Sequence, residues 1–141
     1  METMMTRLEQ FFSCFGSADL EGAGRMIEAD AEFVAVRPDR DARLPLYGTF
    51  RGAGGLAEFC HGLASAFETH AFEIGDVVET GSLAYASGRF HHVVRATGLP
   101  FASDFAVRLR YRDGLITHYQ FYEDTARLET AFRLAGRECA Q

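Results

Sequence analysis

The chain has 141 residues, the length of one ordinary domain, and 48% of them are hydrophobic. This composition excludes an intrinsically disordered chain. The net charge of −6 argues against a nucleic-acid partner and against an anionic membrane surface, because phosphate groups are bound by basic faces. No apolar run approaches the roughly 18 residues of a membrane span. We expect one globular domain over residues 1–141 that binds neither nucleic acid nor membrane.

Residue usage suggests a source and a compartment. All 14 basic residues are Arg, and the chain has no Lys and no Asn, which is typical of a GC-rich bacterial genome. The three cysteines, Cys14, Cys60 and Cys139, are widely spaced and form no CxxC pair. Reduced thiols in a cytoplasm are the simplest interpretation, and residues 1–10 lack the apolar segment of a signal peptide. We therefore expect a cytoplasmic protein.

The N-terminal third predicts two helices and a strand. Apolar residues recur at helical spacing in the first helix. Asp19 is suited to cap a short second helix. A strand is expected over 32–36, followed by a long irregular connection over 37–55. The inward residues of the two helices are Leu8, Phe11, Phe12 and Phe15 in the first, and Leu20, Ala23, Met26 and Ile27 in the second.

The rest of the chain predicts a helix, four strands and a closing helix. A third helix carries its apolar residues at helical spacing, namely Leu56, Phe59, Cys60, Leu63 and Phe67. The pattern then changes to period two, with strands expected at 71–80, 83–95, 101–112 and 115–123. Asp113-Gly114 is the strongest hairpin signal, since a type I′ turn needs positive φ at both positions. Asp124 can cap the closing helix. The inward residues of that helix are Leu128, Ala131, Phe132 and Ala135.

The predicted order is α-α-β-α-β-β-β-β-α. Consecutive hairpins imply a curved antiparallel sheet with the helices on its concave side, an α+β arrangement. A sheet wrapped around helices makes a cone, and a cone can enclose a pocket.

Four stretches accompany this order of elements. They are Phe15-Gly16-Ser17-Ala18-Asp19-Leu20, Tyr47-Gly48-Thr49-Phe50-Arg51-Gly52, Arg112-Asp113-Gly114-Leu115-Ile116 and Tyr119-Gln120-Phe121-Tyr122-Glu123-Asp124-Thr125-Ala126. Together with the order of elements, they resemble the SnoaL-like branch of the nuclear-transport-factor-2-like superfamily, which includes polyketide cyclases and ketosteroid isomerases. The resemblance covers nearly the whole chain.

The resemblance implies a cone-shaped fold, a deep apolar pocket for a small hydrophobic molecule, and a homodimer formed through the sheet face. It does not fix an activity, because such folds host isomerases, cyclases, dehydratases, hydrolases and binders. Ketosteroid isomerase chemistry needs a carboxylate base, a Tyr and a protonated Asp. Their positions fall on Ala35, Phe11 and Val107 here, so we do not expect a ketosteroid isomerase.

A different set of polar residues is expected in the cone. His92 shares the inward side of its strand with Phe90, and an imidazole can act as a general base. Tyr119 can donate to an oxyanion, with Glu123 or Asp104 as the carboxylate that orients the imidazole. Proton transfer of this kind needs no cofactor. The five His show no HxH or HExxH spacing, so no metal site is expected.

Simpler roles remain open for the same residues. His92 can be a buried residue that merely hydrogen-bonds a neighbour, and Glu123 can be solvated beside the last helix. Asp124 is better suited to capping than to catalysis. Cys60 fits inert packing on the third helix.

Two functions fit these observations. The first is a cofactor-independent isomerase, cyclase or lyase that uses acid/base chemistry on a hydrophobic carbonyl compound. The second is a non-catalytic binder or sensor of a small hydrophobic metabolite. A cone filled by its own side chains, with dimerisation as the whole function, is the third possibility. The expected pocket lining is apolar and comprises Phe11, Phe15, Phe59, Cys60, Phe90, Phe105, Val107 and Phe121.

Overall fold

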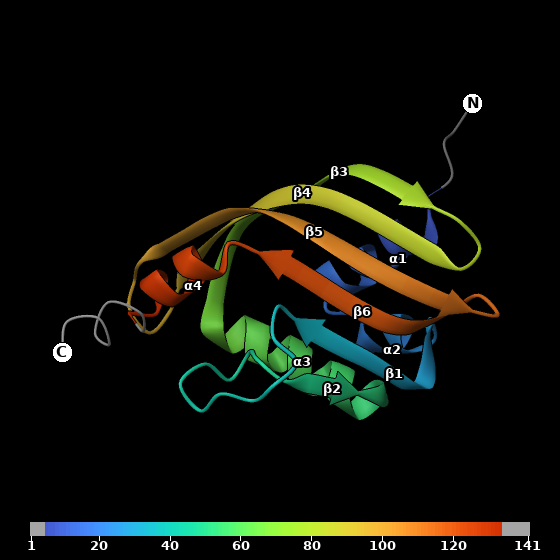
Figure 1. Cartoon of the computed structure of the whole chain (residues 1–141), viewed down its shortest axis with the longest axis horizontal. Coiled ribbons are helices and arrows are strands. Elements are labelled where there is room, and N and C mark those ends of the chain that lie inside the picture. Colours follow the sequence, from blue (N-terminus) through green and yellow to red (C-terminus); the bar gives the residue numbers. More distant parts are fainter. Residues whose placement is uncertain (1–4, 134–141) are drawn as a thin grey trace.

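Ten elements make up the structure, a computed structural model that describes residues 5–133 (Figure 1). The helices are α1 (Arg7–Gly16), α2 (Leu20–Gly24), α3 (Gly52–Ala66) and α4 (Thr125–Ala131). The strands are β1 (Ile27–Ala35), β2 (Thr49–Arg51), β3 (Phe67–Glu79), β4 (Leu83–Val94), β5 (Pro100–Arg112) and β6 (Leu115–Glu123). Among the described residues, no helix is long and apolar enough to cross a bilayer.

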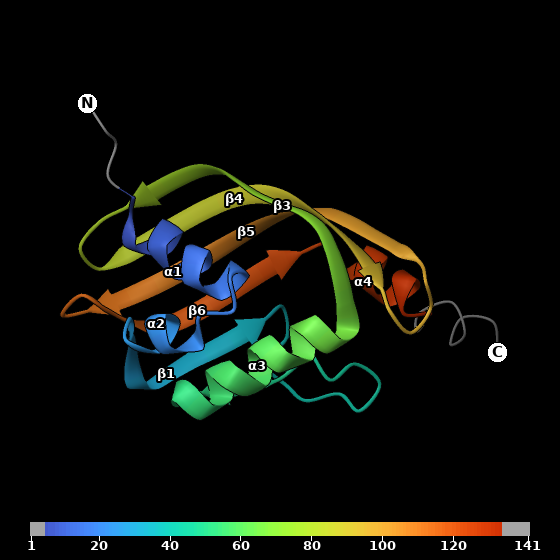
Figure 2. The same ribbon diagram turned by 180° about the vertical axis from the view of Figure 1, so that it is seen from behind.

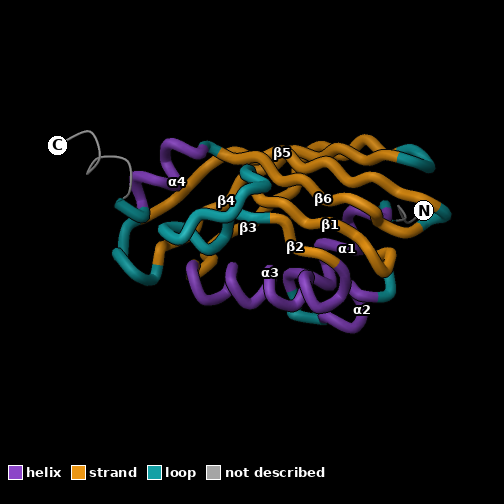
Figure 3. Tube along the Cα trace, turned by 60° about the horizontal axis from the view of Figure 1, so that its bottom comes forward, coloured by secondary structure: helices purple, strands orange, loops and turns teal. Residues whose placement is uncertain are grey.

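The strands form one sheet in the order β2-β1-β6-β5-β4-β3. Neighbouring strands are antiparallel except for β1 and β6, which run parallel. Helices α1, α2 and α3 cover the concave face of the sheet (Figure 2). They form a separate layer from the strands, and α4 lies at one end of the sheet (Figure 3). The predicted α+β fold, a curved sheet packed on helices, is confirmed.

The boundaries differ from the prediction in three places. The connection over 37–55 contains a short strand, β2, which pairs with β1. Strand β1 begins at Ile27 rather than at residue 32, so Ile27 belongs to the sheet and not to the second helix. Strand β3 begins at Phe67, directly after α3. Of the residues expected on the closing helix, Ala135 lies outside the described part of the chain, as does Cys139.

The predicted turn and caps are present. The β5–β6 turn has φ angles of 52° at Asp113 and 82° at Gly114, as a type I′ turn requires. Asp124 accepts a hydrogen bond from the backbone N–H of Arg127 at 3.1 Å and so caps α4. Asp19 caps α2 in the same way. These side chains satisfy N–H groups that a helix leaves unpaired at its start.

The curvature of the sheet depends on β3 and Gly88. The pairing of β3 with β4 shifts register twice, between Thr69 and Ala71 and between Ile74 and Asp76. Gly88 lies opposite the second shift, and a Cβ there would collide with the carbonyl oxygen of Glu73 and lie 2.8 Å from the ring of Phe105. Irregularities of this kind bend and twist a strand pair. The outer strands therefore curl over the helices.

Helix α1 is fixed to the far end of β3 by one carboxylate. Glu79 accepts hydrogen bonds from the backbone N–H groups of Arg7 at 3.0 Å and Leu8 at 3.1 Å, and from the Tyr111 hydroxyl at 2.6 Å. A carboxylate at a helix N-terminus also interacts favourably with the helix dipole. Thr6 and Glu9 complete a capping box at the same terminus.

We expect Glu79→Ala to lower the free energy of unfolding by about 2–3 kcal/mol, because three donors lose a charged acceptor. Urea unfolding followed by circular dichroism measures the change. Glu58→Ala, at an exposed position of α3, is the control and should stay within about 0.5 kcal/mol of the wild type. Equal effects of the two variants would contradict the role of Glu79.

Candidate functional site

A cavity of about 850 Å³ lies between the concave face of the sheet and helices α1 and α3. This volume is in the range of small-molecule sites. The helices border it partly with small residues, among them Gly16, Ala57 and Ala64, which leave space that larger side chains would fill. Exposed Met5, Leu20 and Phe72 also belong to the wall.

Half of the expected apolar lining borders this cavity. Phe15, Phe59, Cys60 and Phe121 contribute to the wall as predicted. Four expected residues are buried in the core but do not reach the cavity, namely Phe11, Phe90, Phe105 and Val107.

Other aromatic rings cover the residues that do not reach the cavity. Phe72 stacks on Phe105 with ring centroids 4.8 Å apart, and Phe121 stacks on it at 4.9 Å. His92 covers Phe90 at 4.3 Å. Phe90 and Phe105 are thus buried beneath a second layer of rings, which separates them from the cavity.

Tyr119 is the central polar residue of the wall. Strand β6 places its ring, which is 3% exposed, against Phe33 and Phe59, with centroids 5.7 Å apart in both cases. No described residue hydrogen-bonds to its hydroxyl. Burial raises the pKa of Tyr119 well above its usual range, and the nearby Glu123 adds to the shift. The phenol therefore stays protonated and can donate to a ligand.

Glu123, at the end of β6, brings a carboxyl group to the same cavity. Its side chain makes no hydrogen bond or ion pair with any residue of the described chain. Burial raises the pKa of Glu123 from 4.5 to about 7, because the charged form loses hydration without gaining a partner. At neutral pH the group can accept or release a proton, which is the property required of a general acid or base.

His92 also lines the cavity, but as a neutral residue. Its ring lies between Phe67 and Phe90, with centroids at 4.5 and 4.3 Å, and its Nδ1 is 2.9 Å from the Thr69 hydroxyl oxygen. Burial lowers the pKa of His92 to about 4, and His91 adds to the shift. An imidazole with this pKa is a weak base at pH 7. By pKa, Glu123 is better suited to proton transfer than His92, and among the described residues no hydrogen bond joins the two.

Asp104 does not belong to the site. Its neighbours Ser103 and Phe105 are buried, so the alternation of β5 turns Asp104 to the outer face. There its side chain is 84% exposed and lies 3.6 Å from Arg89. The expectation that Asp104 orients a catalytic group is corrected on this ground.

Cys60 lines the cavity as a thiol. Burial raises its pKa to about 11, so it is not a nucleophile at neutral pH. Of the three positions aligned with isomerase catalysts, only Ala35 borders the cavity, and it offers no functional group. Within residues 5–133, no three His, Cys, Asp or Glu side chains lie close enough to hold a metal ion.

The long connection before β2 contributes Leu46 and Tyr47 to the cavity wall, which the sequence did not predict. Tyr47 lines the wall and donates a hydrogen bond from its hydroxyl to Glu129 of α4 at 3.0 Å. Arg37 lies 3.7 Å from the same carboxylate and 5.4 Å from the Tyr47 ring. Leu128 of α4 also borders the cavity. The only sequence signal was the unusual length of this connection.

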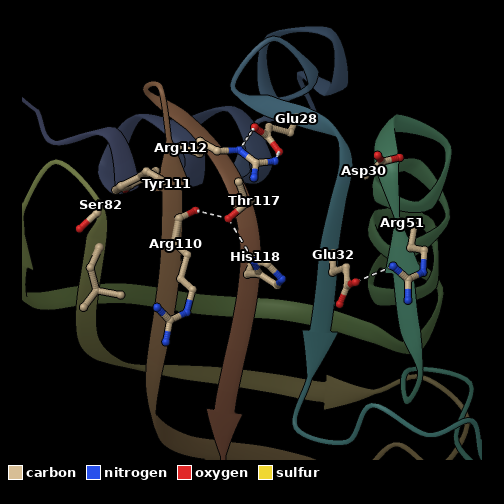
Figure 4. Close-up of a pocket in the computed structure, with 11 residues that line it drawn as sticks. Glu28, Asp30, Glu32, Arg51, Ser82, Arg110, Tyr111, Arg112, Thr117 and His118 are labelled. Carbon is tan, nitrogen blue, oxygen red and sulfur yellow. Dashed lines mark hydrogen bonds and ion pairs between the residues drawn. The ribbon is translucent and has the colours of Figure 1, made fainter.

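A second hollow, of about 680 Å³, lies beside β1, β5 and β6 (Figure 4). Its charges largely neutralise each other. Arg112 binds the carboxylate of Glu28 through two hydrogen bonds, and Arg51 pairs with Glu32. Arg112 thus makes an ion pair that joins β5 to β1. Because these groups are already paired, we place the candidate site in the cone.

The profile of the SnoaL-like domain matches residues 8–119, and the chain belongs to this family. Among solved structures, an NTF2-like protein from Burkholderia xenovorans is similar with a TM-score of 0.80 and 24% identity over 90% of this chain and 93% of that one. No curated protein matches.

Two further structures are similar in fold. A candidate isomerase from Rhodopseudomonas palustris has a TM-score of 0.76 and 16% identity over 92% of this chain and 97% of that one. The protein TerC, crystallised with polyporic acid, has a TM-score of 0.73 and 21% identity over 89% and 95% of the two chains. At these identities the likeness establishes the fold.

The raised pKa of Glu123 predicts how stability depends on pH. A carboxyl whose pKa is 4.5 when unfolded and about 7 when folded favours the fold fully below 4.5, and this contribution is lost as the pH rises through 7. Glu123→Gln removes this pH dependence. Between pH 5 and pH 8, we therefore expect the free energy of unfolding of the variant to rise by about 1–3 kcal/mol relative to that of the wild type.

Urea unfolding of both proteins at the two pH values measures this gain. Glu58→Gln, at an exposed position, serves as control and should follow the wild type. Parallel pH profiles of wild type and Glu123→Gln would contradict the burial of an unpaired carboxyl.

Proposed function

We propose that this SnoaL-like protein is a cofactor-independent enzyme that moves a proton on an apolar carbonyl compound bound in the cone. The observation that carries the proposal is the unpaired carboxyl of Glu123, with a pKa of about 7, on the same aromatic wall as the unpaired hydroxyl of Tyr119. A base tuned near the working pH and a donor for the developing oxyanion are the two groups that such a reaction needs.

The proposed steps conserve atoms and charge. The substrate carbonyl oxygen accepts a hydrogen bond from Tyr119. The ionised Glu123 removes a proton from the carbon next to the carbonyl, and the electron pair moves to the oxygen to give an enolate. Where the enolate is conjugated with a C=C bond, the protonated Glu123 returns the proton to the far carbon of that bond, so that the carbonyl re-forms and the C=C bond shifts. If the enolate carbon instead attacks a second carbonyl carbon of the substrate, that C=O π bond opens, its oxygen takes the proton from Glu123, and the product is a ring.

His92 is proposed as a neutral hydrogen-bonding residue of the same wall. Its Nδ1 is occupied by Thr69, and the flanking rings hold the imidazole plane. It would position a polar group of the substrate without changing its own charge.

A non-catalytic binder of hydrophobic metabolites is the second candidate. It is favoured by one observation, that the three positions aligned with isomerase catalysts carry Phe11, Ala35 and Val107. In that case the aromatic wall would supply affinity, and Glu123 would form a hydrogen bond with the ligand.

Hydrogen–deuterium exchange in ketones tests the catalytic proposal. We expect the protein to accelerate the loss of α-proton NMR signals from a panel of two-ring ketones, 1-tetralone among them, in D₂O at pH 7.5. Glu123→Gln should reduce the enzymatic rate by about 10²-fold or more, and Tyr119→Phe by about 10-fold to 10²-fold. Glu58→Gln is the control and should leave the rate unchanged.

If the protein is a non-catalytic binder, we expect a different result with the same ketones. A ketone that stays bound in native mass spectrometry, with no acceleration of exchange, would support the binder and contradict catalysis on that compound. Exchange that Glu123→Gln leaves unchanged would refute the assignment of the base.

We also propose that the protein forms a homodimer through the outer face of the sheet. Val78, Tyr85 and Tyr122 are 68%, 49% and 45% exposed there, and Val78 pairs directly with Tyr85. Beside them, the Nε atom of Arg108 is buried without a hydrogen-bond partner in the described chain. A second copy would cover the apolar residues and offer acceptors to this guanidinium.

Sedimentation equilibrium tests this assembly. We expect a mass of twice 15.6 kDa for the wild type, and a shift to monomer for Tyr85→Glu, because a buried carboxylate would lie at the interface. Leu20→Glu makes the same change at an exposed apolar residue on the helical side and should remain dimeric. A monomeric wild type would refute the proposal.

A further inference from the structure

Within residues 5–133, no arginine borders the cavity, although all 14 basic residues of the chain are Arg. Two arginines of the connection before β2 lie over aromatic rings. Arg37 pairs with Glu129 and lies over the ring of Tyr47, and Arg40 lies over the ring of Phe50. A negatively charged ligand group would find no guanidinium to pair with.

The titratable side chains that border the cavity include two carboxyl groups, Glu9 and Glu123, and two imidazoles, His61 and His92. The carboxylate of Glu9 is already hydrogen-bonded within the cap of α1, and burial lowers the pKa of His92. Glu123 supplies a carboxyl without a counter-ion, while Tyr119 and Cys60 supply a phenol and a thiol. The C-terminal end of α1 also borders the cavity through Phe15 and Gly16, and its last turn holds no basic residue. The backbone carbonyl groups at such an end carry partial negative charge. The local field therefore opposes an anion.

We propose that the cavity selects its ligand by charge. It accepts uncharged and basic apolar molecules and rejects carboxylates and phosphates of the same shape, and Glu123 is the residue that determines this selection. The inference rests on the proposed function in one respect, that the cone is the ligand site. It holds whether the ligand is converted or only bound.

The physical reason lies in desolvation. An anion entering the cavity would lose its hydration and meet the carboxylate of Glu123 among Phe rings, with no compensating cation. An alcohol or ketone carries no such cost. A protonated amine would donate a hydrogen bond to Glu123 and lie against aromatic faces, which attract cations. The expected order of affinity is therefore amine, then alcohol, then carboxylate.

Three probes with one skeleton test the selection, namely 2-naphthylmethylamine, 2-naphthalenemethanol and 2-naphthoate. Isothermal titration calorimetry at pH 8 should show 2-naphthoate binding at least about tenfold more weakly than the alcohol. In Glu123→Gln we expect the affinities for naphthoate and alcohol to approach within about threefold, and the advantage of the amine to disappear. Glu58→Gln makes the same charge change outside the cavity and should keep the wild-type order.

A variant with a filled cavity distinguishes two claims, that the cone is the ligand site and that Glu123 selects the ligand by charge. Ala57→Trp places an indole in the cavity wall and should abolish binding of the alcohol. If the alcohol still binds this variant, or if no probe binds the wild type, the cone is not the ligand site, and the proposed function fails together with the selection. If the alcohol needs the open cavity but naphthoate binds the wild type as tightly, only the charge selection is refuted. An unchanged order in Glu123→Gln would refute the role of Glu123.

Discussion

The bend of the sheet at Gly88 is the constraint on which the cavity depends. Two register shifts in β3 and the missing side chain of Gly88 let the outer strands curl without a clash against Glu73 and Phe105. A flat sheet would press its inner face against α1 and α3 and leave no space. The curl instead separates the sheet from the helices at one end, and small residues on the helices leave the cavity open.

The same curl brings aromatic rings to the concave face, where polar groups lose part of their hydration. This is why one carboxyl there has consequences that a surface carboxyl would not have. Glu123 has no partner in the described part of the chain, so its proton is held more tightly, and no described residue accepts a hydrogen bond from the Tyr119 hydroxyl. The reactivity and the charge preference that we propose both rest on this one unpaired carboxyl in an apolar wall.

Much of this could be predicted from residue spacing. The inward side of β6, with Tyr119, Phe121 and Glu123, follows from its alternation, and the same rule applied to β5 puts Asp104 outside. Strand β2 could not be predicted, because three residues become a strand only through pairing with β1. The lowered pKa of His92 and the raised pKa of Glu123 could not be predicted either, because they depend on burial, which arises from packing between strands distant in sequence.

Strand β3 forms the outer wall of the cavity and is fixed at both ends. It follows α3 without a loop, and its last residue, Glu79, is bonded to the start of α1. Between these anchors lie its two register shifts and the half-exposed ring of Phe72. Because both ends of β3 are anchored, a movement of this strand that widens the cavity for a ligand would have to occur in its irregular middle, between Thr69 and Asp76.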